Sequence, residues 1–285
     1  MKKRILSYDI FRGSLLIGMV AFHIIVNLTD NIFDQRLFYW VPLGFVLFLG
    51  VVLGKFLQGK CKKKLILAAK LLGLFTIFNI PNIMNKSPEV LDFIQGNQEV
   101  LSFEILVPMI LVILLSILFD KVSQIGKYLG VIAFIALIVL THLGIYFYNL
   151  NFTLYGLIGY FLSTSLDLDK VAQKADNIWG TLASVAISLA PFYLVMKVDL
   201  FDYVVLLQVL AMYFLFNIAF KDTKSLAMLG KHSLFLYVAH ILVIKLMSSY
   251  FMLENNLELA GLTVGFLGVM WGFTYLVEKR NWKLL

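Results

Sequence analysis

The chain is a succession of apolar segments, each about 20 residues long, that short polar joints separate. A segment of this length can cross the hydrocarbon core of a bilayer as a helix, because a helix satisfies its backbone hydrogen bonds internally. Hydrophobic residues make up 61% of the chain and charged residues 14%, which is outside the range of soluble domains. We therefore expect an all-α integral membrane protein with a single domain over residues 1–285.

Ten apolar segments are predicted to span the membrane. They cover residues 10–29, 37–57, 65–84, 100–119, 126–148, 151–165, 178–196, 202–220, 232–251 and 258–277. The sixth segment is short for a span, so it could instead join the fifth through residues 148–151 and give nine helices. The two counts place the later joints on opposite sides of the membrane.

Basic residues distinguish the two counts, because cytoplasmic joints carry an excess of lysine and arginine. With ten spans and cytoplasmic termini, most of the 24 lysines and arginines lie on the cytoplasmic side. They gather in joints 1–4, 55–64, 121–127, 170–174, 221–231 and 279–283. The sequence therefore predicts a bundle of about ten transmembrane helices with both termini cytoplasmic, in the cell membrane. The same rule accounts for the net charge of +7, so we expect no nucleic-acid partner.

The stretch of residues 7–27, which includes most of the first apolar segment, places Asp9, Arg12, His23 and Asn27 in an otherwise apolar run. Ionisable groups within a bilayer cost at least ~2.5 to 3.5 kcal/mol each, so they indicate a function. Eleven helical steps of about 100° bring His23 to within about 20° of Arg12, roughly 16.5 Å further along. Asp9 and Asn27 extend the same stripe at spacings of three and four. Both residues also have a purely structural interpretation. Arg12 could be a snorkelling arginine paired with Asp9, and His23 could be a hydrogen-bonded histidine between helices.

A second polar stripe opens the ninth apolar segment. It comprises Ser233, Tyr237 and His240, within LGKHSLFLYVAHILVIKL at residues 229–246, and Lys231 lies just before it at the cytoplasmic end. Ser233 and Tyr237 are four residues apart, and Tyr237 and His240 three, so these side chains share a helix face. Tyr237 could equally be an interfacial anchor, and the charge rule already predicts a lysine at position 231.

Two more polar residues in the middle of the chain are candidate substrate contacts, together with Asn27. Glu104 is the carboxylate that we place inside a span, where it needs a partner or a raised pKa. Asn82 lies beside Asn79 and Pro81, where a kink is predicted near the outer end of the third segment. Backbone groups that a kink releases can line a cavity.

Two stretches resemble the transmembrane acyltransferase superfamily. The run DIFRG at residues 9–13, with a histidine eleven residues after its arginine, resembles the opening helix of these proteins. That grouping includes the family-three acyltransferases and the relatives of heparan-α-glucosaminide N-acetyltransferase. The stretch from residue 229 is similar to a second family element, with a glycine, a Ser-aromatic helix start, and Tyr and His separated by two residues. The segment around Glu104 partly resembles a third element, although Pro108 departs from its spacing.

The resemblance implies transfer of an acyl group, most simply acetyl, from cytoplasmic acyl-coenzyme A. The acceptor would be a hydroxyl or amino group of an extracytoplasmic glycan or lipid-linked sugar. His23 is then the catalytic histidine, as general base or acyl carrier, and Arg12 helps to hold the donor. Beside them, Asp9 would orient Arg12 and His240 would join the catalytic group. Lys231, Ser233 and Tyr237 would contact the donor, and no metal is predicted.

Two other classes of protein stay open. A transporter or permease would use the Arg12/His23 and Tyr237/His240 stripes as a solute or proton pathway. Inverted-repeat transporters have matching halves with broken spans, and we find no internal repeat here. A membrane subunit that keeps the fold without catalysis is the third possibility.

Overall fold

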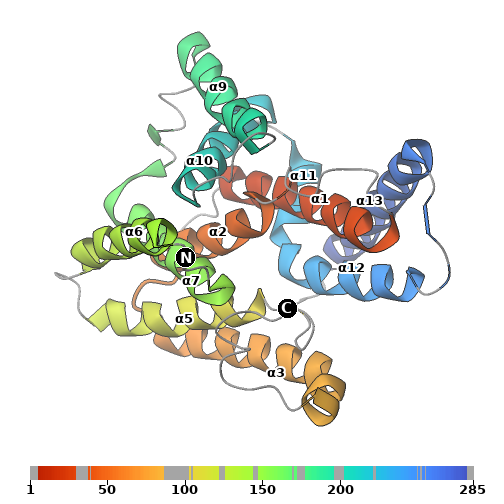
Figure 1. The fold of residues 1–285 in the computed structure, drawn as a ribbon, viewed down its shortest axis with the longest axis horizontal. Coiled ribbons are helices and arrows are strands. Elements are labelled where there is room, and N and C mark those ends of the chain that lie inside the picture. The colour runs from red at the N-terminus through yellow and green to blue at the C-terminus, as the bar shows by residue number, and fades with distance from the viewer. Residues whose placement is uncertain are drawn as a thin grey trace. The chain divides into compact units, whose positions relative to one another are not determined.

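The computed structural model is helical throughout the residues that it describes (Figure 1), with one isolated β-bridge between Thr29 and Leu253. The described residues are 6–29, 38, 40–86, 103, 105–121, 126–143, 147–168, 170–171, 177–195, 202–220, 223–248, 250, 252–253 and 255–280. The helices are α1 (Leu6–Leu28), α2 (Trp40–Phe56), α3 (Cys61–Lys86), α5 (Leu106–Lys121), α6 (Gly126–His142), α7 (Tyr148–Ser165), α9 (Ile178–Val195), α10 (Asp202–Ala219), α11 (Lys224–Lys231), α12 (Ser233–Met247) and α13 (Asn256–Lys279). The all-α prediction is confirmed for this part of the chain.

Each of the ten predicted segments corresponds to one of these helices, and α11 is an additional helix in a predicted joint. The fused alternative is wrong, because α6 ends at His142 and α7 begins at Tyr148. In the described residues two helices, Leu6–Leu28 and Leu257–Lys279, are long and apolar enough to cross a membrane. The number becomes three if the bent pair α11 and α12 forms one span. The count of ten spans stays a prediction.

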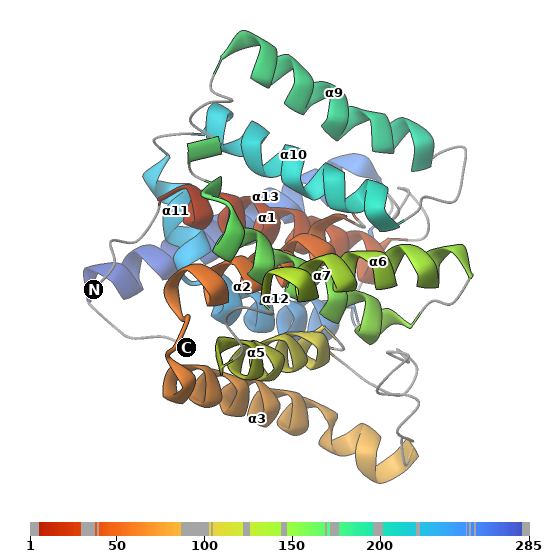
Figure 2. The ribbon, with the colours of Figure 1, turned by 90° about the vertical axis from the view of Figure 1, so that its left-hand side faces the viewer.

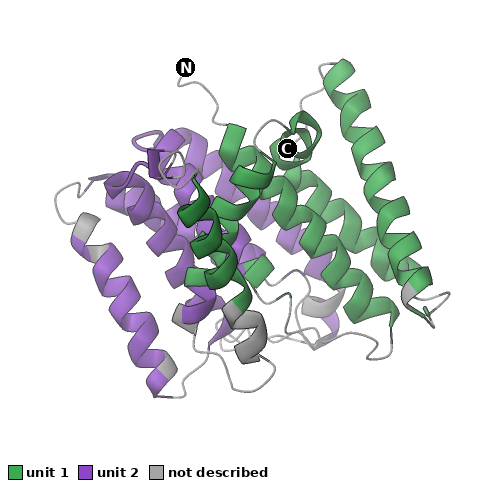
Figure 3. Cartoon of the chain, turned by 90° about the horizontal axis from the view of Figure 1, so that it is seen from above, with its two compact units in different colours: residues 1–42, 172–200, 207–285 green, residues 43–171, 201–206 purple. Residues whose placement is uncertain are grey.

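The chain divides into two compact units, which Figure 3 shows in different colours. Unit 1 comprises residues 1–42, 172–200 and 207–285, and unit 2 comprises residues 43–171 and 201–206. Unit 1 therefore contains both polar stripes, although they lie near opposite ends of the sequence. The single domain over residues 1–285 stays a prediction.

Close helix crossings organise unit 2 around the buried helix α7. A Cβ on Gly159 of α7 would overlap the main-chain oxygen of Leu47 in α2, and a Cβ on Gly50 would overlap that of Gly156. Small residues at such crossings let helix backbones approach closely in membrane bundles. Helix α5 contacts both α3 and α7, and it lies beside α3 in Figures 1 and 2.

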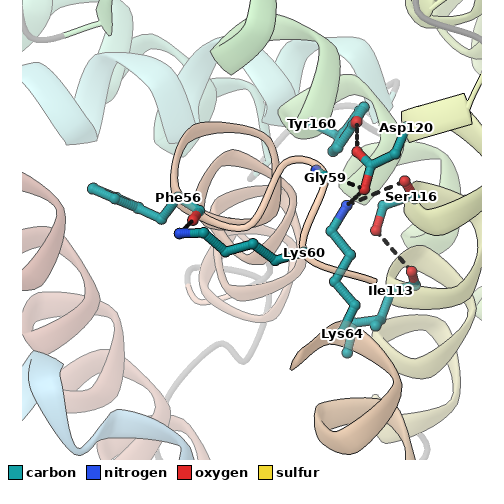
Figure 4. A network of polar contacts seen from close by, with 8 residues as sticks. All are labelled: Phe56, Gly59, Lys60, Lys64, Ile113, Ser116, Asp120 and Tyr160. Carbon is teal, nitrogen blue, oxygen red and sulfur yellow. Dashed lines mark hydrogen bonds and ion pairs between the residues drawn. The ribbon is translucent and has the colours of Figure 1, made fainter. Parts of the chain in front are cut away.

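A buried ion pair joins α3 and α5 within unit 2 (Figure 4). Lys64 Nζ lies 2.8 Å from Asp120 Oδ2, and the two side chains are 0% and 3% exposed. Asp120 also accepts from Tyr160 Oη at 2.7 Å and from Gly59 N at 3.0 Å, while Lys64 donates to the Ser116 carbonyl at 3.1 Å. The charge rule counts Lys64 merely as one more lysine of a cytoplasmic joint, and its burial is a finding of the structure.

Helix α3 continues through Pro81 to Lys86. Asn79 Nδ2 donates to the Phe75 carbonyl one turn earlier, at 2.9 Å. Figures 1 and 2 show the last turns of α3 bending away from the preceding ones, in agreement with the kink that Asn79 and Pro81 predict.

Candidate functional site

The candidate site lies in unit 1, where α1 crosses α11 at two glycines. A Cβ on Gly230 would overlap the main-chain oxygen of Asp9, and a Cβ on Gly13 would overlap that of Leu226. A side chain at either position would keep the helices apart. Because Gly13 follows Arg12 and Gly230 precedes Lys231, the crossing brings the two polar stretches of the sequence together.

Replacing Gly230 by alanine should destabilise the protein. The added methyl group meets main-chain atoms that cannot rotate away, and overpacking a close-packed interior costs about 1 to 3 kcal/mol. Gly261→Ala in α13 is the matched control, because nothing lies within 4 Å of its Cβ position. Thermal unfolding in detergent should give a lower midpoint for Gly230→Ala and an unchanged or higher one for Gly261→Ala. Equal midpoints would contradict the close crossing.

The chain bends sharply just after this crossing. Helices α11 and α12 are inclined by 77° at a break that consists of His232 alone. Ser233, the first residue of α12, is buried at the break and faces α1 through its contact with Arg12. The break therefore places the hydroxyl of Ser233 beside Arg12 of α1.

Arg12 connects the two predicted stripes. Its Nη2 donates to Ser233 Oγ at 2.8 Å, across 221 residues of sequence. Its Nη1 lies 3.9 Å from Asp9 Oδ1, so the predicted contact with Asp9 is present as well. The half-buried guanidinium is thus oriented by α1 and α12 together. A snorkelling arginine paired with Asp9 would need contacts with its own helix only.

Farther along α1, His23 lies against His240 of α12. The ring centroids are 5.3 Å apart and the rings are inclined by 52°. His240 is 1% exposed, and its Nδ1 lies 3.0 Å from the Leu236 carbonyl oxygen. A carbonyl only accepts hydrogen bonds, so Nδ1 carries a proton, and Nε2 is the acceptor of the neutral ring.

His240 Nε2 is the notable atom of this pair. It is buried and has no hydrogen-bond partner among the described residues. Leaving a buried polar atom without a partner costs about 1 to 3 kcal/mol, so His240 Nε2 is suited to accept a hydrogen bond from a bound molecule. The nearby imidazole of His23 makes this position suitable for a molecule that exchanges a proton with histidine.

Tyr237 and Asn27 flank the histidine pair. The Tyr237 ring meets that of His240 edge-on, with centroids 5.6 Å apart. Asn27 Nδ2 donates to the His23 carbonyl at 2.8 Å, within α1. Tyr237 therefore packs directly on the site, whereas the amide nitrogen of Asn27 is engaged by its own helix. The substrate contact of Asn27 stays a prediction.

Lys231 has a partner that the sequence did not reveal. It forms an ion pair with Glu278 Oε1 of α13, and His232 Nε2 lies 2.8 Å from the same oxygen. Glu278 stands beside Lys279 and Arg280 at the end of the last apolar segment. The charge rule weighs only such basic residues, so it gives no sign of the acidic one.

Two predicted substrate contacts are not placed in this cluster. Asn82 belongs to α3 in unit 2, and its side chain lies outside the described residues. Glu104 also lies outside them. Both stay predictions. Within the described part of the chain, no group of three or more His, Cys, Asp or Glu side chains could hold a metal ion.

The site combines an oriented cation with a pair of imidazoles on two crossing helices. A guanidinium can hold phosphate or stabilise a developing negative charge, and an imidazole can take and return a proton. No protein-family model, curated protein or solved structure matches this chain. The function must therefore be argued from the site and from the sequence.

Proposed function

We propose that this protein is a membrane-bound acyltransferase. It moves an acyl group, most simply acetyl, from cytoplasmic acyl-coenzyme A to a hydroxyl or amino group of an extracytoplasmic glycan or lipid-linked sugar. The observation that carries the proposal is that two side chains of α1 contact α12. His23 lies against His240, and Arg12 donates to Ser233. A proton acceptor suits the hydroxyl or amino group of the acceptor, and a fixed cation suits an anionic donor.

In the direct route, His23 removes the proton of the acceptor as its oxygen or nitrogen attacks the thioester carbonyl. The carbon–sulfur bond breaks, the acyl group stays on the acceptor, and the imidazolium returns its proton to the departing thiolate of coenzyme A. In the second route His23 attacks the thioester carbonyl, the carbon–sulfur bond breaks, and the second ring nitrogen of His23 gives its proton to the departing thiolate. The acceptor then attacks the acyl-imidazole, the acyl–nitrogen bond breaks, and the proton of the acceptor returns to the His23 ring. Arg12, oriented by Asp9, stabilises negative charge on the donor, and His240 supports the imidazole of His23.

The proposal includes a topology of about ten spans with both termini cytoplasmic, in the cell membrane. Arg12 then lies toward the cytoplasm and His23 toward the outer half of the bilayer. Contacts within unit 2 support this orientation, because joints that are predicted to be cytoplasmic meet one another there. Lys55 Nζ lies 3.1 Å from Asp167 Oδ1, and Lys64 pairs with Asp120.

Purified protein in detergent should release coenzyme A from acetyl-coenzyme A when sugars are added as acceptors. The reaction should need no membrane potential, because its free energy comes from the thioester. Thiol release can be followed in a Cys61→Ser background, which removes the one cysteine of the chain. Absence of acceptor-dependent release, together with solute flux in proteoliposomes, would contradict the enzyme and favour the transporter.

A further inference from the structure

We propose that Glu278 is an internal anion, which fills the phosphate position of the donor and must leave it when the donor binds. The identity of the donor rests on the proposed function. The existence of an anion site rests on the contacts of Lys231 and His232 alone. The two parts can therefore be tested separately.

One carboxylate oxygen receives both nitrogen donors of this cluster. Glu278 Oε1 pairs with Lys231 Nζ, and His232 Nε2 lies 2.8 Å away from it. An ionised carboxylate only accepts hydrogen bonds, so both nitrogens donate. Two donors that converge on one anionic oxygen can hold a phosphate oxygen in the same way. Glu278 thus occupies a position that suits an anionic ligand.

The cluster is open to solvent at its charged end. The side chains of Lys231 and Glu278 are 40% and 33% exposed, whereas that of His232 is 9% exposed. A ligand from the cytoplasm can therefore reach the pair, while His232 stays fixed at the break between α11 and α12. An ion pair with this exposure is weak because solvent screens it, so a ligand of higher charge can displace the carboxylate.

The anion site adjoins the catalytic groups through the chain itself. Ser233 follows His232 directly and accepts from Arg12 at 2.8 Å. Helix α13 is held against α12 by stacking of Phe273 on Phe235, with ring centroids 5.6 Å apart. A phosphate held by Lys231 and His232 would lie beside Ser233, and Glu278 would be pushed aside without loss of the stacked contact.

The role of Glu278 is to make binding depend on the charge of the ligand. A singly charged anion replaces the carboxylate without electrostatic gain, whereas a bisphosphate brings more charge to the same two donors. Glu278 thereby favours donors that carry several phosphate charges. It also keeps Lys231 and His232 paired while no donor is bound.

Binding of adenosine 3′,5′-bisphosphate to the purified full chain tests this inference, because the nucleotide supplies the phosphates without the thioester. Isothermal titration should show Glu278→Gln binding it roughly five- to tenfold more tightly than the unsubstituted chain, equivalent to about 1 to 1.4 kcal/mol. Lys231→Gln should bind it more weakly, and adding Glu278→Gln to Lys231→Gln should restore little. Glu258→Gln is the matched control at the opposite end of α13, where Glu258 pairs with Asn255, and its affinity should be unchanged.

Tighter binding by Glu278→Gln, with loss in Lys231→Gln, would support the internal anion. Equal or weaker binding by a folded Glu278→Gln would overturn it, even where acyl transfer is observed. If Glu278→Gln fails to fold, Glu278→Asp keeps the charge on a shorter arm and should also bind more tightly. Failure of the proposed function has a different signature, because the nucleotide would still bind while no coenzyme A is released from acetyl-coenzyme A.

Discussion

His23→Ala should lower acceptor-dependent release of coenzyme A by about 10²- to 10⁴-fold, the range that a positioned general base contributes. The loss should be larger in the second route, because an acyl carrier cannot be replaced by water. The fold should persist, since the His23 ring meets the rings of Phe22 and His240 and takes no part in the close glycine crossing of α1 with α11. Initial rates with acetyl-coenzyme A and a sugar acceptor, measured in detergent, check this expectation.

His142→Ala is the control for this experiment. His142 ends α6 in unit 2, is exposed, and has Nδ1 2.9 Å from the Ile138 carbonyl oxygen. Its removal tests the loss of a histidine that is not one of the candidate catalytic residues, and the rate should stay unchanged. An equal loss in His142→Ala, or a collapse of the unfolding midpoint in His23→Ala, would mean that the effect is structural.

Asp120→Asn should destabilise the protein by about 3 to 5 kcal/mol, the cost of breaking a buried ion pair by removing one partner. Lys64, with 0% of its side chain exposed, would lose its anionic partner. The amide nitrogen of asparagine would also replace an oxygen that accepts from Tyr160 or Gly59. Chemical or thermal unfolding in detergent measures the difference.

Asp167→Asn provides the comparison, because it breaks the exposed pair with Lys55 in the same unit. The Lys55 hydrogen bond lowers the pKa of the Asp167 carboxyl below its ordinary value. A lowered pKa in the folded state stabilises the fold above the ordinary pKa, and this contribution disappears as pH falls through the lowered value. Solvent screening keeps the contribution small, so Asp167→Asn should change the midpoint little. Equal effects of the two substitutions would contradict the buried pair.

A double substitution separates charge from shape. Lys64→Met with Asp120→Leu removes both charges and keeps similar volumes, so it should recover much of the stability that Asp120→Asn loses. Tyr160 and Gly59 would still lose their acceptor, and recovery should therefore be incomplete. A double variant less stable than Asp120→Asn would mean that packing, and not charge, holds this end of unit 2.

Helix positions could be predicted from the sequence because each apolar run is long and polar joints mark its ends. The predicted segment 10–29 corresponds to α1 at Leu6–Leu28, and 258–277 to α13 at Asn256–Lys279. Helix α11 was not predicted, because its eight residues mix Lys224 and Lys231 with apolar residues and read as a joint. The position of α11 is explained by its close packing against α1 at Gly13 and Gly230, and not by the composition of α11.

The site was only partly accessible to sequence reasoning. Helical periodicity placed Arg12 and His23 on one stripe, because that relation depends on one helix alone. The contacts of Arg12 with Ser233 and of His23 with His240 depend on a crossing between distant segments, which local spacing does not encode. Resemblance to a family suggested that both stripes belong together. The pairing of Lys231 with Glu278 had no such signal.

Mass spectrometry of surface glycans tests most directly whether His23 drives acyl transfer to an extracytoplasmic acceptor. Glycans would be compared from cells that lack the protein, cells complemented with the unsubstituted chain, and cells complemented with His23→Ala at equal membrane abundance. An acyl modification should appear only with the unsubstituted chain. The same modification in His23→Ala cells would contradict the catalytic role of His23.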